Sequence, residues 1–193
     1  NPIDKSQVPS VLYIGRLIDC KGLEYLIEAF AIVSCKAPGA KLIIGGEGPE
    51  EARLRQQVKR LGLDESILFA GLIESQDLSR YYREAAVFVL PSVQAEGQTE
   101  GLGVVLLEAM ACGTPVIGSN VGGIPDIIQD GWNGYLVQER SPPELAERII
   151  ALLESQTVRK QFQENGLQTV YEQFSWNHVS AKFTQTYDRL VSL

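Results

Sequence analysis

Two acidic residues, Glu100 and Glu108, stand out because the segment between Glu100 and Gly113 carries no other charge. The eleven residues from Leu102 to Cys112 hold one charge, that of Glu108. A helix that is apolar on nearly all sides is expected to be buried, and a lone carboxylate on it is costly unless it has a partner. Two interpretations of Glu108 stay open. It is either in a local salt bridge or at a helix edge in solvent, or it faces a ligand cleft.

The spacing of the two carboxylates suits one elongated ligand. In a continuous helix they would lie about 12 Å apart along the axis and roughly 80° apart around it. Between them, Gly101, Leu102 and Gly103 would offer free backbone N–H groups, which together with the helix dipole favour a phosphate. The resulting order is a polar group at Glu100, a phosphate at the amides and a diol at Glu108. A nucleoside diphosphate sugar has the same order of sugar, diphosphate and ribose.

Two basic residues follow the first apolar run, in the sequence GRLIDCKG (15–22). A phosphate-binding P-loop would need glycine at Cys20 and serine or threonine at Gly22, so that interpretation fails. What remains is Arg16 directly after a predicted strand and Lys21 just before a predicted helix. These cations could anchor a diphosphate without metal, and the chain has no Asp-x-Asp pair to hold a bridging ion. The alternative is two solvated surface cations.

Two further glycine-rich turns carry weaker signals. The sequence GGEGPEE (45–51) offers Gly46 and Gly48, but Glu51 stands where a dinucleotide fingerprint needs its third glycine. A tight turn before a helix that starts at Pro49 explains the same residues. In SNVGGIPDII (119–128), the paired glycines let the backbone approach another group closely, although a plain strand-to-helix turn explains them equally well.

Short apolar runs alternate with helical patterns, and these elements must position the residues above. The runs are continuous, as in parallel strands that are buried on both faces. We predict strands at 11–15, 41–46, 66–70, 86–90, 115–118 and 134–137. Helices are predicted at 23–33, 54–61, 75–84, 103–112, 145–153, 155–171 and 176–190. This alternation predicts an α/β fold: a doubly wound, mostly parallel sheet with helices on both faces, whose ligands bind beyond the carboxyl ends of the strands.

Composition excludes several functions. The 193 residues, of which 45% are hydrophobic, suffice for one domain with a sizeable core. A net charge of −7 with no block of Lys and Arg argues against nucleic-acid binding, and no apolar run is long enough for a membrane span. The three cysteines lack a CxxC pair and indicate reduced, cytoplasmic thiols rather than a disulfide frame or a zinc site. The single histidine, His178, is interpreted as a surface or packing residue.

Taken together, these turns resemble the nucleotide-sugar-binding half of glycosyltransferase family 4, the retaining enzymes of GT-B fold. The likeness runs from about Val11 to Leu190. Its pieces, in order, are GRLIDCKG, GGEGP, LFAGLI, VFVLPS, EGLGVVLLEAMACGTPVI, GGIPDII, GWNGYLV and FSW. The specific pattern is two glutamates separated by seven residues and followed by Ala-Met-Ala-x-Gly-x-Pro-Val. Two departures from the family are mild: Leu102 stands where Phe is common, and Asp126 where Glu is common.

The resemblance implies a role for each matching position. Arg16 and Lys21 would hold the donor diphosphate and stabilise the leaving group, and Glu100 would contact the donor sugar. These three are the expected catalytic residues. Glu108 would bind the ribose hydroxyls. Further donor contacts are expected from the loop at Gly101, from the amides of Leu102 and Gly103 at the distal phosphate, from the backbone near Leu72 and Ile73 at the base, and from Gly46.

The resemblance also implies an organisation. Residues 1–9 would be a hinge remnant from a missing N-terminal acceptor-binding domain, 10–174 the donor domain, and 175–193 a C-terminal helix that packs toward the missing domain. The expected reaction moves a sugar from a nucleoside diphosphate, most commonly UDP in the family, to an acceptor hydroxyl without metal or another cofactor. The isolated domain would bind donor but transfer little or nothing. Any membrane association is assigned to the missing half.

Two alternatives stay open at this point. One is a nucleotide-sugar epimerase-like enzyme of the same fold. The other is a non-catalytic module that binds a nucleotide or a protein. A receiver-type signalling domain would be an example, but it needs clustered aspartates at strand ends, whereas the first strand here ends in Gly15 and Arg16. The loop between Ser92 and Glu100 is longer than usual for the family. The resemblance therefore does not fix the local geometry around the donor sugar.

Overall fold

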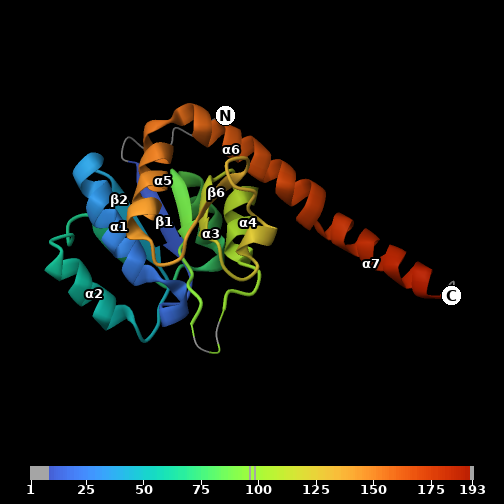
Figure 1. Ribbon diagram of the computed structural model, residues 1–193, viewed down its shortest axis with the longest axis horizontal. Coiled ribbons are helices and arrows are strands. Elements are labelled where there is room, and N and C mark those ends of the chain that lie inside the picture. Colours follow the sequence, from blue (N-terminus) through green and yellow to red (C-terminus); the bar gives the residue numbers. More distant parts are fainter. Residues whose placement is uncertain (1–8, 96, 98, 192–193) are drawn as a thin grey trace.

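The fold is built on one six-stranded parallel sheet, seen in a computed structural model that describes residues 9–95, 97 and 99–191. The strands are β1 (Ser10–Ile14), β2 (Lys41–Gly45), β3 (Ile67–Gly71), β4 (Val87–Leu90), β5 (Val116–Ser119) and β6 (Gly134–Val137). Their order in the sheet is β3-β2-β1-β4-β5-β6 (Figure 1). The chain builds outward from β1 to β3 and then crosses back to β4. Strands β1 and β4 are therefore the neighbours at which the direction of winding reverses.

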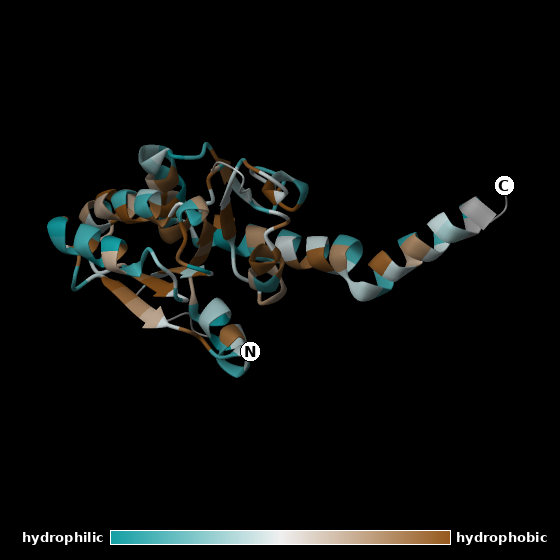
Figure 2. Cartoon of the chain, turned by 90° about the horizontal axis from the view of Figure 1, so that it is seen from below, coloured by the Kyte–Doolittle hydropathy of each residue, from teal (hydrophilic) through white to brown (hydrophobic). Residues whose placement is uncertain are grey.

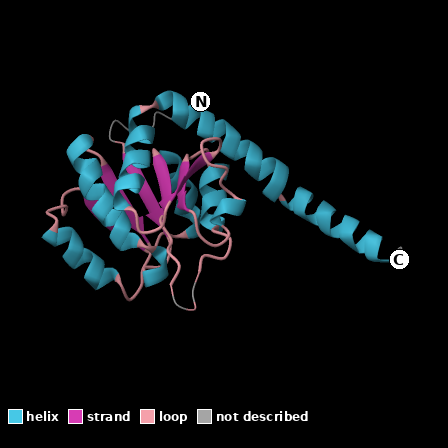
Figure 3. Cartoon of the chain, viewed as in Figure 1, coloured by secondary structure: helices cyan, strands magenta, loops and turns pink. Residues whose placement is uncertain are grey.

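Helices cover both faces of this sheet (Figure 3). Helix α1 packs against α2 and α5, whereas α3 packs against α4 on the other side. Their bounds are α1 (Leu23–Lys36), α2 (Glu51–Arg60), α3 (Ser75–Glu84), α4 (Val104–Ala111), α5 (Pro142–Glu154), α6 (Gln156–Thr169) and α7 (Trp176–Val191). Short 3-10 turns span Asp19–Lys21 (η1) and Ile124–Asp126 (η2), and a π-helical stretch spans Val170–Phe174 (η3). The predicted doubly wound architecture is confirmed.

The strands form where continuous apolar runs permit burial on both faces. All four residues of β4 are buried, and β1 is buried from Ser10 to Tyr13. The register of β1 against β2 runs from Ser10 opposite Lys41 to Ile14 opposite Gly45. Every predicted strand is present, and each of its ends is shifted by at most one residue. The core lies between the sheet and its two helical layers, as the run lengths predict.

Helix α4 differs from its prediction in how deeply it is buried. Leu106, Ala109 and Met110 are buried, but Val104 is 56% exposed and Leu102, just before the helix, is 39% exposed. The expectation of a helix buried on nearly all sides was therefore wrong. Apolar composition around the whole helix does not say whether a neighbour covers every side, and within the described residues none covers the side that carries Val104.

Helix ends follow local signals that the sequence carries. Gly62 stands after the end of α2 with a φ of 68°, the left-handed backbone that favours glycine at this position. The Ser155 hydroxyl caps α6 by accepting a hydrogen bond from the Val158 amide at 3.3 Å. The Ser175 hydroxyl accepts one from the His178 amide, also at 3.3 Å, at the start of α7. Both serines therefore cap the helices that follow them.

The C-terminal helix α7 forms an arm that leaves the body of the fold (Figure 1). Among the described elements it contacts η3 substantially, and large side chains on it lie open to solvent. Trp176 is 86% exposed, Phe183 61% and Tyr187 65%. Figure 2 shows that hydrophobic residues recur along the arm as well as in the sheet. No helix in the described ranges is long and apolar enough to cross a membrane.

Candidate functional site

A cleft of about 760 Å³ opens at the carboxyl ends of β1 and β4, at the point where the winding reverses. It is lined by Arg16, Ile18, Asp19, Cys20, Lys21, Pro49, Glu50, Gly97, Thr99, Glu100 and Gly101. A smaller hollow of about 290 Å³ shares Arg16, Lys21, Glu100 and Gly101 and extends to Leu102, Gly103 and the start of α4. Arg16, Lys21 and Glu100 thus line both hollows, and the larger one adds the carboxylates of Asp19 and Glu50, at the place where the fold predicts a ligand.

Arg16 is presented to the cleft by a turn that is fixed at both sides. The amide of Gly15 donates to the Gly45 carbonyl at 3.0 Å, and the amide of buried Leu17 donates to the Glu47 carbonyl at 2.9 Å. The Tyr13 hydroxyl donates to the Arg16 carbonyl at 2.9 Å. The Arg16 side chain itself is exposed and makes no hydrogen bond or ion pair with the described residues. Its guanidinium is available to an anion in the cleft.

Tyr13 is a buried phenol directly beneath this turn. Burial, followed by the negative charge of Glu100, raises the pKa of Tyr13 far above its usual value. The side chain is therefore a neutral hydroxyl that donates its proton to the Arg16 carbonyl. A Cβ on Gly15 would lie 2.6 Å from the Tyr13 hydroxyl oxygen, so glycine is needed at that position. Sequence reasoning missed Tyr13, because an apolar strand context gives no signal for its hydroxyl.

Lys21 and Glu100 form an ion pair within the cleft. The Lys21 Nζ lies 2.5 Å from the Glu100 Oε2, and the two side chains are 17% and 10% exposed. The Ser92 hydroxyl donates to the same oxygen at 2.7 Å. Ser92 is fully buried just after β4. The two predicted catalytic residues are thus in contact although 79 positions separate them, and a serine that the sequence analysis did not select holds one of them.

The loop around Glu100 rests on the two glycines at the end of β5. The Gly123 amide donates to the Glu100 carbonyl at 3.3 Å. A Cβ on Gly122 would lie 2.0 Å from the Glu100 carbonyl oxygen, and one on Gly123 would lie 2.1 Å from the Gly101 carbonyl oxygen. The close approach predicted for this glycine pair is therefore to the backbone at Glu100 and Gly101. Larger residues would displace the loop that carries the carboxylate.

The predicted phosphate-binding amides lie at the start of α4, but the continuous helix does not reach Glu100. Gly103 precedes the helix with a φ of 77°, so Glu100 lies in the loop outside it. The separation of about 12 Å expected for a continuous helix therefore does not apply. Gly101, Leu102 and Gly103 line the smaller hollow next to Arg16. Backbone N–H groups in the first turn of a helix lack partners within the helix and favour an anion.

Glu108 lies on the exposed side of α4 and has one fixed partner. The Tyr82 hydroxyl donates to the Glu108 Oε2 at 2.8 Å. Burial, followed by this hydrogen bond, raises the pKa of Tyr82, which stays protonated as a donor. Glu108 is not among the residues that line either hollow. It stands on the same helix as the amides of the first turn, with one carboxylate oxygen held and the other unpaired among the described residues.

Three other predicted contact residues lie at the ends of β2 and β3. The Gly46 amide donates to the Gly71 carbonyl at 2.7 Å, and a Cβ on Gly46 would lie 1.9 Å from the Gly15 carbonyl oxygen. Ile73 packs over Gly45, where a Cβ would meet its Cδ1 at 2.4 Å. Leu72 is 74% exposed. None of the three lines the described cleft, and Gly46 joins the ends of neighbouring strands.

The sheet order and its cleft define a Rossmann-like α/β domain with a cleft at the carboxyl edge of its sheet. Comparison of the sequence with protein families then identifies the family. The chain belongs to the glycosyl transferases group 1 family, whose model matches residues 3–169. The resemblance to glycosyltransferases of GT-B fold is thereby confirmed, with the chain corresponding to their C-terminal domain.

Individual relatives agree with this assignment. A GDP-mannose-dependent phosphatidylinositol monomannoside mannosyltransferase of Mycobacterium tuberculosis is 32% identical over 90% of this chain and 46% of its own length. The C-terminal domain of a group 1 glycosyl transferase (LpcC) from Francisella tularensis superposes with a TM-score of 0.80 at 31% identity, covering 91% of this chain and 94% of that one. Anabaena Alr3699/HepE in complex with UDP and glucose gives 0.82 at 27% identity, covering 98% and 50%. The chain spans about half the length of the curated relatives it matches.

Proposed function

We propose that this chain is the donor-binding half of a retaining glycosyltransferase, which moves a sugar from a nucleoside diphosphate sugar to an acceptor hydroxyl. The observation that carries the proposal is the meeting of Arg16, Lys21 and Glu100 in one cleft at the switch point of the sheet. A leaving diphosphate gains negative charge as the glycosidic bond breaks. Fixed cations at that position stabilise the transition state more than the ground state.

The residues take separate parts in this reaction. Arg16 and Lys21 bind the diphosphate. The Arg16 guanidinium has no hydrogen bond or ion pair with a described residue and binds phosphate directly. Lys21 exchanges its contact with Glu100 for one with phosphate. Glu100 faces the donor sugar. Amides at the start of α4 bind the distal phosphate, and Glu108 accepts hydrogen bonds from the ribose hydroxyls. The base lies near Leu72, whose exposed apolar side chain would be covered by it.

Metal independence is part of the proposal. A divalent ion in a phosphate site neutralises the charge that develops on the leaving group. Arg16 and Lys21 supply two positive charges at the same place, each worth about 1.5–3 kcal/mol through charged hydrogen bonds. Nucleotide binding is therefore expected to persist in the presence of a chelator. Loss of nucleotide binding on addition of EDTA would contradict this part alone.

The exposed aromatic side chains of α7 are suited to packing against a second domain. Trp176, Phe183 and Tyr187 would pack against the acceptor-binding half of the longer enzyme, as the resemblance implies. The acceptor pocket and the surface that brings the enzyme to its acceptor belong to that half. A cytoplasmic location is part of the proposal, and it is supported by Cys20, Cys35 and Cys112, none of which forms a disulfide.

A thermal-shift panel tests the donor assignment. UDP, GDP and ADP, with their glucose, mannose and N-acetylglucosamine derivatives, are added to the folded chain in the presence of EDTA. A ligand at a hundred times its dissociation constant stabilises the folded state by about 2.7 kcal/mol, which raises the unfolding midpoint by several degrees. UDP is the expected nucleotide. The UDP bound to Alr3699/HepE supports it, whereas the mycobacterial relative is GDP-mannose-dependent. A panel that stays flat both with and without EDTA would contradict the proposal.

A further inference from the structure

One turn outside the cleft has an unusual backbone. Arg140 lies between β6 and α5 with a φ of 57°, and it is the only non-glycine residue with a positive φ in the described part of the chain. The left-handed region is disfavoured for residues that carry a Cβ. Such a conformation persists where the surrounding contacts hold the residue in it. At Arg140 these contacts come from its own side chain and from that of its neighbour Glu139.

Glu139 and Arg140 together hold both polar backbone groups of Gln94. The Gln94 amide donates to the Glu139 Oε2 at 2.8 Å, and the Arg140 Nη2 donates to the Gln94 carbonyl at 2.6 Å. The two side chains also pair with each other, at 3.9 Å between the Arg140 Nε and the Glu139 Oε2. The left-handed backbone therefore coincides with a residue whose side chain is held by two contacts.

The segment that they hold is connected directly to the catalytic carboxylate. Gln94 follows Val93, whose amide donates to the Cys20 carbonyl at 2.8 Å, next to Lys21. Val93 follows Ser92, whose hydroxyl donates to the Glu100 Oε2 at 2.7 Å. Three consecutive residues are thus anchored in turn to Glu100, to η1 and to the Glu139–Arg140 turn.

This arrangement leaves one oxygen of Glu100 for a ligand. Both Lys21 and Ser92 contact Oε2, and among the described residues Oε1 has no hydrogen-bond partner. The Glu100 side chain is only 10% exposed, so its direction is set by these contacts rather than by solvent. Lys21 would shift its contact when a diphosphate enters. Ser92 is neutral and buried, and it keeps its contact with Glu100 in either state.

We propose that Ser92 is the positioning residue for Glu100 and that the Glu139–Arg140 turn is a clamp that holds Ser92 in place through Gln94. The inference rests on the proposed function, in which Glu100 faces the donor sugar. None of these residues touches the donor. Their effect is to aim Oε1 at the sugar, so their loss weakens binding of the sugar part and leaves binding of the nucleotide part unchanged. A purely structural role would weaken both alike or neither.

Two variants with matched controls test the proposal in the folded chain. Ser92→Ala removes the buried hydroxyl, and Ser10→Ala does the same at the opposite edge of the sheet, where Ser10 is 9% exposed. Arg140→Gly removes the guanidinium while keeping a residue that tolerates a positive φ. Arg80→Ala is its control, because the Arg80 side chain is 57% exposed against 51% for Arg140.

Calorimetry measures affinity for UDP and UDP-glucose, or for GDP and GDP-mannose if the wild-type chain prefers that base. Ser92→Ala is expected to weaken sugar-nucleotide binding about tenfold, the effect of one hydrogen bond to a charged group. Arg140→Gly is expected to weaken it about threefold, because a half-exposed contact holds Gln94 less tightly. Affinity for the free nucleotide stays within about twofold in both, and the controls match the wild type.

Amide hydrogen exchange gives a second readout that needs no ligand. Arg140→Gly is expected to speed exchange at Gln94 and Val93, and unchanged exchange there overturns the clamp. Faster exchange with an unchanged ratio of sugar-nucleotide to nucleotide affinity overturns the link to Glu100, and leaves the proposed function in place. A wild-type chain that binds no nucleotide at all overturns the proposed function and this inference with it.

Discussion

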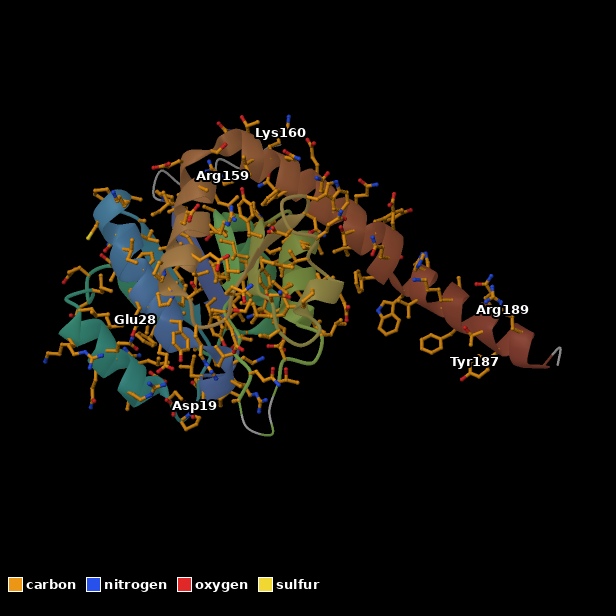
Figure 4. All side chains as sticks on the ribbon, viewed as in Figure 1. Asp19, Glu28, Arg159, Lys160, Tyr187 and Arg189 are labelled. Atoms are coloured by element: carbon orange, nitrogen blue, oxygen red, sulfur yellow. The ribbon has the colours of Figure 1, made fainter. Side chains whose placement is uncertain are left out.

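The carboxyl edge of the sheet and the α7 arm differ in how their side chains are satisfied. At the edge, Lys21 from η1 and Ser92 from the loop after β4 both contact Glu100 in that same loop. On the arm, Trp176 and Tyr187 lie open to solvent, and Figure 4 shows Tyr187 well clear of the body. The chain's own folding therefore specifies the edge to the level of single atoms. In the arm, folding of the chain forms a helix whose large apolar side chains no other described element covers.

The largest effect is expected from a change that forces the strand ends apart. Gly46→Ala places a Cβ 1.9 Å from the Gly15 carbonyl oxygen at a φ of 119°, so backbone must move. We expect the free energy of unfolding to fall by about 3–5 kcal/mol, as for a severe backbone conflict. Denaturation in urea measures it. Gly39→Ala is the control, because Gly39 has a φ of 93° and nothing within 4 Å of an added Cβ.

The control separates two causes. Gly39→Ala carries the cost of a positive φ alone, about 1 kcal/mol or somewhat more. The difference between the two variants reports the close approach of β1 and β2 at the site. Equal losses would mean that Gly46 is required only for its dihedral angles and that the edge can relax.

A second change removes a charge without disturbing packing. Arg16→Ala is expected to weaken UDP binding about 10- to 100-fold, the value of a charged hydrogen bond to phosphate, and to leave uridine binding nearly unchanged. The change in the free energy of unfolding is expected to be small, because the Arg16 guanidinium is exposed and has no partner among the described residues. Calorimetry with both ligands measures the difference. Equal losses for UDP and uridine would show that Arg16 does not contact the diphosphate.

A third change tests the far end of the ligand. Glu108→Ala is expected to weaken UDP binding about tenfold, because the carboxylate would accept hydrogen bonds from both ribose hydroxyls. The matching ligand change is 2′-deoxy-UDP, which should bind the wild type more weakly and the variant without further loss. A full additional loss with the deoxy ligand would place the ribose elsewhere. Tyr82→Phe, which removes the donor to Glu108, is expected to have a smaller effect in the same direction.

Much of the sheet could be predicted because parallel strands buried on both faces require continuous apolar runs. Those runs also located Arg16 and Lys21, since residues that follow a parallel strand must lie at its carboxyl edge. Burial of α4 was predicted wrongly, because composition counts apolar residues but not the neighbours that cover them. Val104 is apolar and 56% exposed at the cleft side of the helix.

Contacts between distant segments escaped the sequence analysis for a physical reason. The pairing of Lys21 with Glu100 depends on the register of β1 against β4, which no local pattern encodes. The hold of Arg140 on Gln94 depends in addition on a left-handed backbone at a residue type that rarely adopts it. The sequence thus predicts which residues lie at the carboxyl edge of the sheet. The contacts that orient their side chains are seen only once the strands are paired in the structure.

The smallest effect is expected from removing the arm. Deletion of residues 175–193 should shift the unfolding midpoint by no more than about 1–2 °C, because burial of apolar surface supplies the stability and the arm buries little of it. Differential scanning calorimetry of the two chains measures the shift. Deletion of residues 156–193, which also removes α6 and its contacts with α4, is the control and should lower the midpoint by many degrees.

A large loss on deleting 175–193 would mean that α7 packs back on the body in solution, and the contrast between edge and arm would fail. A negligible loss would sharpen that contrast. Trp176, Phe183 and Tyr187 would then be apolar side chains that contribute nothing to folding of this chain. Apolar surface of that kind is retained where another body covers it. The arm would then act as a docking element, whereas the contacts at the sheet edge form within this chain.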